Sequence, residues 1–369
     1  MTFFRTGFFV LLMALLFSAT SQAKKPPCEI VRAGFDIGSG ATKLKVARVD
    51  VCRNRLLKIL FPLTAQDKKQ AVKSVGYKKD LTDSFKDPAR VNCTLSKFIQ
   101  QEGAGVLKNL RALVLKRFPT AAFAGVATSA FRQAKNGKEV IAFLSKAAGI
   151  KISIISQQEE AFLGYRAVLA RLPGQNPGKL MVWDIGGSSM QMVYRNKQGK
   201  LATYLGHLAS VPMATWVIEK AQGASRRTKP SPNPVQADDA RRGVAYAQKR
   251  ATRELTKAAP YILQQARGWK VVGIGGVHAF SIQKQAADGQ KQYSLADVQQ
   301  ALKLRIAKSD GEVARLNNPL NPQDAMDFVS TEVTNLVLIS GFLKAMNLNR
   351  VHILSANLSD GLFVSPEYW

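Results

Sequence analysis

Apolar residues alternate with polar ones in several short stretches of the chain, and recur at helical spacing in longer stretches between them. The alternating stretches predict strands, the first at residues 30–37 and 41–51 on either side of a turn at 38–40. Further strands are predicted at residues 121–127, 151–156, 179–183, 190–195, 269–275 and 351–354.

Helical spacing and capping residues predict the other elements. Thr94 is the expected N-cap of a helix running towards residue 118, and Glu159 is expected to open a helix that stops at 172–174. Helices are also predicted at residues 136–149, 235–259 and 325–346. The polar residues 64–92 predict a loop, and residues 223–234 predict an exposed basic one.

Strands that alternate with helices indicate an α/β protein, and the hairpin at each of two turns indicates mixed rather than purely parallel sheets. At 369 residues the chain is long enough for two domains. We expect them at residues 24–150 and 151–369, with the last helix free to pack back on the first domain.

The first residues have the pattern of a cleavable signal peptide. Arg5 gives a positive start, residues 8–17 form an apolar run, and Ala23 ends a small-residue cleavage site. A transmembrane anchor is the alternative, but ten apolar residues are too few to cross a bilayer. We therefore expect residues 1–23 to be removed and the protein to be periplasmic or secreted, beginning near Lys24, with no stable membrane anchor.

Charge and cysteine content change this picture. Lys and Arg number 53 against 25 Asp and Glu, a formal net charge of +28, which favours a polyanionic partner; a generally basic protein is the alternative.

The cysteines are Cys28, Cys52 and Cys93. The first two flank the predicted hairpin symmetrically, so in an exported protein we expect them to form a disulfide and Cys93 to be left over; free thiols are the alternative.

Three glycine-rich turns follow apolar strands. Asp36 precedes the turn Gly38–Gly40, Asp184 precedes Gly186 and Gly187, and residues 273–276 hold a third turn. Consecutive amides in such turns form a nest for phosphate oxygens, and a neighbouring carboxylate can hold Mg²⁺. The chain contains no Walker A motif. The turns predict a phosphate site shared by two halves of the protein.

These motifs, with others between them, resemble the exopolyphosphatase / guanosine pentaphosphate phosphohydrolase family of the actin–Hsp70–sugar kinase superfamily. The resemblance is to the short form, without a C-terminal helical domain. It implies two actin-like (ribonuclease H-like) domains with mixed sheets and an interdomain active-site cleft. The matching segments, in family order, lie at residues 35–39, 127–132, 154–161, 184–187, 275–276 and 354–362.

The resemblance also implies a reaction: water hydrolyses a phosphoanhydride without a covalent intermediate. Glu160 matches the family's catalytic base, with Glu159 the less favoured carboxylate, and Arg132 matches an arginine near the phosphate. Asp36 and Asp184 would carry Mg²⁺. Amides of the turn residues Ser39, Gly40, Gly186, Gly187, Ser188, Gly275 and Gly276 would surround the terminal phosphate.

The chain departs from the family pattern at several positions. Ser188 replaces a glycine, Gln191 a glutamate and Val277 a threonine. Gln191 resembles instead the ecto-apyrases, so an apyrase-like nucleotidase is one alternative to a polyphosphate or guanosine pentaphosphate hydrolase. A non-catalytic phosphate-polymer or nucleotide binder is another. We expect no specific nucleic-acid partner, because no nucleic-acid module appears. A homodimer stays an open alternative.

Overall fold

Two mixed sheets of six strands each hold the strands of the computed structural model, which describes residues 27–85, 87 and 89–369. The predicted signal peptide lies outside these residues. The α/β class with mixed sheets is confirmed, since parallel and antiparallel pairs occur in both sheets. In the described part, no helix is long and apolar enough to cross a membrane.

The first sheet has the strand order β3-β2-β1-β5-β6, with β4 also paired to β2. Its centre is the predicted antiparallel hairpin of β1 and β2, followed by the parallel strand β5. The strands are β1 (Glu29–Ile37), β2 (Ala41–Asp50), β3 (Arg55–Phe61), β4 (Val72–Ser74), β5 (Ala122–Ala127) and β6 (Lys151–Ile154). The helices of this half are α1 (Ala65–Ala71), α2 (Tyr77–Asp83), α3 (Lys97–Arg117), α4 (Ser129–Gln133) and α5 (Gly137–Ala148).

Alternation along β1 decides which side chains meet the helices. Ala33, Phe35 and Ile37 point to one face, where they pack with residues of α3 and α5 in one buried cluster. Gly34 and Asp36 therefore point to the opposite face. Asp36 thus lies on the face of the first sheet opposite α3 and α5.

The second sheet has the order β11-β12-β10-β7-β8-β9. Its strands are β7 (Leu180–Ile185), β8 (Met190–Arg195), β9 (Leu201–Gly206), β10 (Lys270–Ile274), β11 (Gln292–Tyr293) and β12 (Val351–Ile353). Its helices include α7 (Ser210–Trp216), α8 (Ala237–Ala258), α9 (Pro260–Gln265), α10 (Gln283–Gln285), α11 (Leu295–Arg305), α12 (Asp310–Asn317) and α13 (Val329–Met346), with the π-helical segment η4 (Val277–Ile282).

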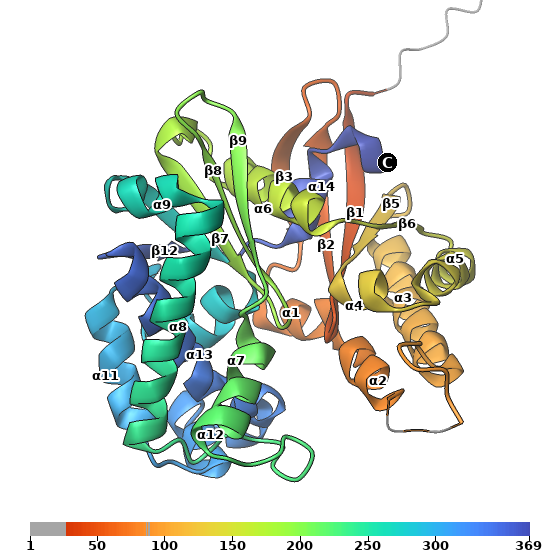
Figure 1. Cartoon of the computed structure of the whole chain (residues 1–369). Coiled ribbons are helices and arrows are strands. Elements are labelled where there is room, and N and C mark those ends of the chain that lie inside the picture. Colours follow the sequence, from red (N-terminus) through yellow and green to blue (C-terminus); the bar gives the residue numbers. More distant parts are fainter. Residues whose placement is uncertain (1–26, 86, 88) are drawn as a thin grey trace, which may run out of the picture.

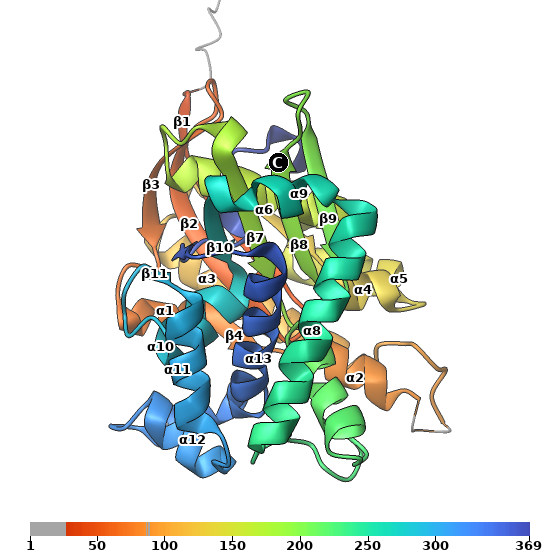
Figure 2. The same cartoon turned by 60° about the vertical axis from the view of Figure 1, so that its left-hand side comes forward.

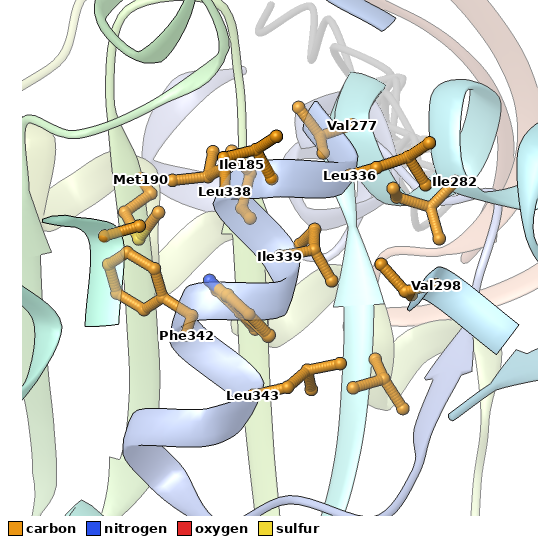
Figure 3. Packing of buried hydrophobic residues seen from close by; sticks show 14 of the residues in the cluster. Ile185, Met190, Val277, Ile282, Val298, Leu336, Leu338, Ile339, Phe342 and Leu343 are labelled. Carbon is orange, nitrogen blue, oxygen red and sulfur yellow. The ribbon is translucent and has the colours of Figure 1, made fainter. Parts of the chain in front are cut away.

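Alternation along β7 has the same effect as in β1. Met181, Trp183 and Ile185 face the larger core, formed with α13 and its neighbours; Figure 3 shows Ile185 and Phe342 in this packing. Val182 faces the opposite side, in a cluster with residues of α6 (Gln157–Arg171). Asp184 follows Val182 by two residues, so it points to the side of α6 as well.

Two helices, α6 and α14 (Leu358–Phe363), lie between the sheets, as Figure 1 shows. They approach closely because Gly361 has no side chain: a Cβ there would lie 2.1 Å from the Leu163 carbonyl oxygen. The Ser359 hydroxyl donates to the Gly34 carbonyl of β1 at 3.0 Å. The C-terminal helix thus contacts the first sheet. Strand β6 belongs to the first sheet too, so the last strand of that sheet ends at Ile154. The first domain was expected to end at residue 150, which is one strand earlier.

The prediction of a loop at residues 64–92 was wrong. This segment contains α1, β4 and α2, and Thr64 caps α1 through a reciprocal pair of bonds with Asp67. These elements were missed because they are short and polar, without a periodic apolar face. Helices α7, α11 and α12 were also not predicted. Helix α13 begins at Val329 rather than at residue 325.

The expected disulfide joins Cys28 to Cys52 across the ends of the β1–β2 hairpin, and Cys93 is free. The hairpin register brings Glu29 opposite Asp50, so the two cysteines follow as neighbours. Their Cα atoms are 5.2 Å apart, an ordinary separation for a disulfide. The bond closes the end of the sheet at which the described chain begins.

A buried histidine lies behind the turn that ends β10. The imidazole of His278 is completely buried beside Trp183, and its Nδ1 lies 2.8 Å from the Tyr293 hydroxyl oxygen. Its Nε2 has no hydrogen-bond partner among the described residues. Burial lowers the pKa of His278 to about 3, so the folded protein holds this ring neutral.

This burial predicts a loss of stability in acid. An unfolded histidine takes up a proton near pH 6.5, whereas folded His278 does so only near pH 3, so acid favours the unfolded state between these values. The free energy of unfolding should fall by about 1.4 kcal/mol per pH unit in that range from this group alone. Urea unfolding at pH 7, 6 and 5 should show a smaller loss for His278→Gln than for wild type. His207→Gln, at an exposed histidine, is the matched control, and an unchanged pH slope in His278→Gln would refute the assignment.

Candidate active site

The first glycine turn connects β1 to β2. The Gly38 amide donates to the Ala41 carbonyl at 2.9 Å, which closes the turn. The Ser39 and Gly40 carbonyls accept from the amides of Lys78 and Val75, at 2.8 and 3.1 Å. The amides of Ser39 and Gly40 themselves have no partner among the described residues, so they are free to donate to a ligand.

The second turn, between β7 and β8, is held in the same way. Its Gly186 amide donates to the Ser189 carbonyl at 3.0 Å, and the Gly187 carbonyl accepts from the Val211 amide at the start of α7 at 2.8 Å. The Gly186 amide is therefore already used, contrary to its expected role as a phosphate donor. The amides of Gly187 and Ser188 have no partner in the described part of the chain and remain for that role.

Open space lies beside the turns. A Cβ atom added at Gly40, Gly187 or Gly276 would meet nothing within 4 Å. Room next to unpaired amides is what a phosphate group needs in order to approach a backbone closely. Each of the three predicted turns thus has a glycine that faces open space.

The third turn is built against the carboxylate of the second. Gly275 has a φ of +81°, and a Cβ there would lie 2.1 Å from Asp184 Oδ1 and 2.7 Å from the Ile185 carbonyl oxygen. Only glycine allows this close approach of backbone to carboxylate. Gly276 follows with ordinary helical angles and leads into η4. Gly275 is therefore a fixed neighbour of Asp184.

Asp36 is buried at the end of β1 and forms an ion pair with Lys43 of β2, whose Nζ lies 3.2 Å from Asp36 Oδ2. The pKa of Lys43 is raised, chiefly by Asp36 and further by Asp184 and Glu160. One ammonium group thus experiences carboxylates from both halves of the protein. Lys43 was not predicted as a site residue; its position directly opposite Asp36 in the hairpin was the available signal.

Glu160 pairs with Arg132. Arg132 Nη1 lies 2.8 Å from Glu160 Oε2 and also donates to the Ile155 carbonyl at 2.8 Å. Burial raises the pKa of Glu160, and the Arg132 charge opposes that rise. Glu159 instead completes a capping box with Ser156 at the exposed start of α6. The structure therefore separates a capping carboxylate from a mostly buried one that is oriented by arginine.

Asp184 lies at the end of β7, directly opposite Gln191 of β8, so their side chains share one face of the sheet. Burial, and after it the Glu160 charge, raise the pKa of Asp184 to about 7. Gln191 is 1% exposed, and its Nε2 donates to Ser189 Oγ at 3.1 Å. A neutral amide thus occupies the position where another carboxylate would add to the repulsion.

The carboxylates fit a hard divalent cation. Lys43 and Arg132 offset part of the negative charge of Asp36 and Glu160, whereas no described cation forms an ion pair with Asp184. Burial is the largest cause of the raised pKa of Asp184, and the charges of Glu160 and Asp36 add to it. Within the described residues these carboxylates do not form a close three-ligand cluster. That suits Mg²⁺, which binds one or two carboxylates together with water and substrate phosphate.

Comparisons with known proteins identify the family and the fold. A sequence model described as the Ppx/GppA phosphatase family matches residues 77–366, a range that includes Arg132, Glu160 and Asp184 and begins after Asp36. One similar structure is that of an Aquifex aeolicus member of the Ppx/GppA family, which is 17% identical in sequence. The match covers 91% of this chain and 97% of that one, with a TM-score of 0.66. An exopolyphosphatase from Cytophaga hutchinsonii has 17% identity, coverage of 90% and 96%, and a TM-score of 0.61. This likeness confirms the expected two-domain, actin-like fold.

The contact between Gly275 and Asp184 yields a prediction. Gly275→Ala places a Cβ on the carboxylate and strains a left-handed backbone, so Asp184 must move. A misplacement of about 1 Å can cost on the order of 100-fold in rate, and we expect that loss in kcat/KM for phosphate release.

Gly105→Ala is the control, because a Cβ there meets open space on the helical backbone of α3, away from the candidate site. It should keep kcat/KM within about threefold of wild type. Thermal unfolding shows whether both variants fold. A folded Gly275→Ala protein with wild-type kcat/KM would show that the position of Asp184 does not matter.

Proposed function

Because the chain belongs to the Ppx/GppA phosphatase family and is thus a phosphoanhydride hydrolase, we propose that it is an exported, Mg²⁺-dependent enzyme that releases the terminal phosphate of polyphosphate or of a guanosine pentaphosphate-type nucleotide. Phosphatases of this family generally use divalent metal ions. The carrying observation is the pairing of Glu160 with Arg132 next to Asp184 and Asp36, because it supplies a base, a cationic clamp and metal ligands together.

In the proposed reaction Glu160 orients a water molecule and accepts its proton as the water oxygen bonds to the terminal phosphorus. The bridging P–O bond breaks, and the shortened chain leaves with the bridging oxygen. The raised pKa of Glu160 brings the base nearer to neutral pH, where general bases act best. Arg132 keeps the carboxylate in place through its second bond to Ile155.

The phosphate oxygens would be held by groups from both sheets. Amides of Ser39, Gly40, Gly187 and Ser188 are available as donors, and Lys43 supplies a positive charge. Asp36 and Asp184 would hold Mg²⁺, which would neutralise charge on the phosphate oxygens. Positioning and charge stabilisation of this kind supply most of the catalysis of phosphoryl transfer.

Polyphosphate is the substrate that we favour, because the net charge of +28, or +27 once Arg5 is removed with the signal peptide, attracts a long polyanion. One observation favours an apyrase-like nucleoside tri- or diphosphate hydrolase instead. Gln191 lies buried opposite Asp184, where a glutamine occurs in the ecto-apyrase motif. Val277, next to the third turn, is also buried. The threonine hydroxyl that the family pattern has at this position would therefore lie in the core rather than in solvent.

Replacement of the base tests the proposal. With Mg²⁺ and, separately, long polyphosphate, guanosine pentaphosphate, ATP and ADP, wild type should release phosphate, most rapidly from polyphosphate. Glu160→Gln should lose roughly 100-fold or more in kcat, because a general base contributes about that much, yet should still bind substrate.

Glu159→Gln removes the same charge one residue away, where glutamine can still cap the helix, and should remain within threefold of wild type. Equal kcat in Glu160→Gln and wild type would refute Glu160 as the base. Preferred release from ATP would favour the apyrase alternative. Tight polyphosphate binding with no release from any substrate would favour a non-catalytic binder.

Export is the second part of the proposal. Its support is the Cys28–Cys52 disulfide, a bond that persists mainly in oxidising compartments, next to the predicted cleavage site before Lys24. Mass spectrometry of protein recovered from the periplasm or medium should show an N-terminus near Lys24. Alkylation after denaturation should modify Cys93 alone without reductant and all 3 cysteines with it. A cytoplasmic protein that retains Met1 would contradict export.

A further inference from the structure

Two adjoining hollows lie over α13, between α8 and α11, among the helices of the second sheet. Figure 2 shows α13 between these two helices. The hollows have volumes of about 520 and 330 Å³ and share Gln248 and Lys344 in their lining. We call them together the α8–α11 groove. Neither hollow is lined by a residue of the candidate active site, so the groove needs an explanation of its own.

The wall formed by α8 carries mostly small side chains, with the longer Arg241 and Gln248 among them. Ala237, Ala240, Val244, Ala245 and Gln248 line the groove, a spacing that places them on one side of the helix. From the first to the last of them the wall is about 16 Å long, at 1.5 Å per residue. Small side chains on a helix allow another backbone to approach closely. The wall therefore has the length and shape to receive about three turns of a second helix.

The floor and the opposite wall are largely apolar. Leu295 lines one hollow and Ile306 the other, and both are partly exposed. Leu343, Leu348 and Leu302 lie below them and are only 1%, 3% and 8% exposed. Ser340 of α13 also lines the groove; it is 1% exposed, and its hydroxyl has no partner among the described residues. A groove with an apolar floor is the usual receptor for the apolar face of an amphipathic helix.

The charges around the groove have one sign. Arg241, Lys303 and Lys344 line it and are exposed, and none of its lining residues is acidic. Arg241 is paired with Asp238 on its own helix, whereas Lys303 and Lys344 form no ion pair with any described residue. An occupant that carries carboxylates would complement these lysines, and a basic occupant would be repelled.

The charge and the apolar floor together decide between occupants. A second copy of this chain is disfavoured, because each mature copy, without Arg5, carries a net charge of +27. A phosphate polymer matches the charge but has no group for the apolar floor. We propose that the α8–α11 groove docks an acidic amphipathic helix of a partner protein. This inference is independent of the proposed phosphate chemistry.

Labelled synthetic peptides can test the proposal on the full mature protein. The probe is a 14-residue helical peptide with leucine on one face and glutamate on the other, compared with one in which serine replaces leucine and one in which lysine replaces glutamate. Fluorescence anisotropy at physiological salt should give the first peptide a Kd at least tenfold lower than either of the others. Equal binding of the leucine and serine versions would mean simple attraction to a basic surface and would overturn the proposal.

Variants locate the binding. Lys303→Glu with Lys344→Glu should raise the Kd at least tenfold, whereas Lys97→Glu with Lys116→Glu makes the same charge change at exposed positions of α3 and should not. Ala245→Trp fills the groove without changing charge and should also weaken binding tenfold. Ala112→Trp, at an exposed alanine of α3, is its control. If the groove variants bind the probe like their controls, the groove is not the docking site.

Two further measurements separate other occupants. Binding of tripolyphosphate that disappears in Lys303→Glu with Lys344→Glu would identify an anion pocket instead. Sedimentation that shows self-association in wild type and its loss in Ala245→Trp would identify an interface between copies. Either result overturns the proposal of an acidic helix; absence of both, together with the expected peptide series, supports it.

Discussion

The structure depends on bringing like charges together. Asp36 comes from one sheet, Asp184 from the other and Glu160 from a helix between them. Burial raises the pKa of Glu160 and of Asp184, and the charge of a neighbouring carboxylate raises each of them further above its ordinary value. Lys43 and Arg132 offset only part of this charge. A folded protein tolerates such a group of carboxylates where a bound cation balances their negative charge. The arrangement costs stability, and it is explained by a site for metal and phosphate.

Strand alternation makes this convergence geometrically simple. In β1 and in β7 the residues beside the aspartate face a helical core, so each aspartate faces the helices between the sheets. Helix α6 then supplies Glu160, and close packing of Gly361 of α14 against Leu163 keeps the sheets near each other. The amides that are free for phosphate lie in turns whose carbonyls are tied to the next segment of each half.

Much of this was predictable from the sequence because it is local. An apolar strand that ends in Asp and a glycine turn indicates a phosphate and metal site without any tertiary information. The symmetric spacing of Cys28 and Cys52 indicated their disulfide. Other features depend on tertiary contacts or on polar segments. The use of the Gly186 amide inside its turn, the role of Lys43 and the membership of β6 in the first sheet appear only once the strands are paired.

In the proposed mechanism, turns from both sheets hold one terminal phosphate between them. The most direct measurement is a crystal structure of the protein with Mg²⁺ and a non-hydrolysable imido analogue of a phosphate chain. Our account predicts that the terminal phosphate accepts hydrogen bonds from amides of Ser39 or Gly40 and of Gly187 or Ser188, with the metal on Asp36 or Asp184. A terminal phosphate bound by only one of the two turns, or bound away from Glu160, would contradict it.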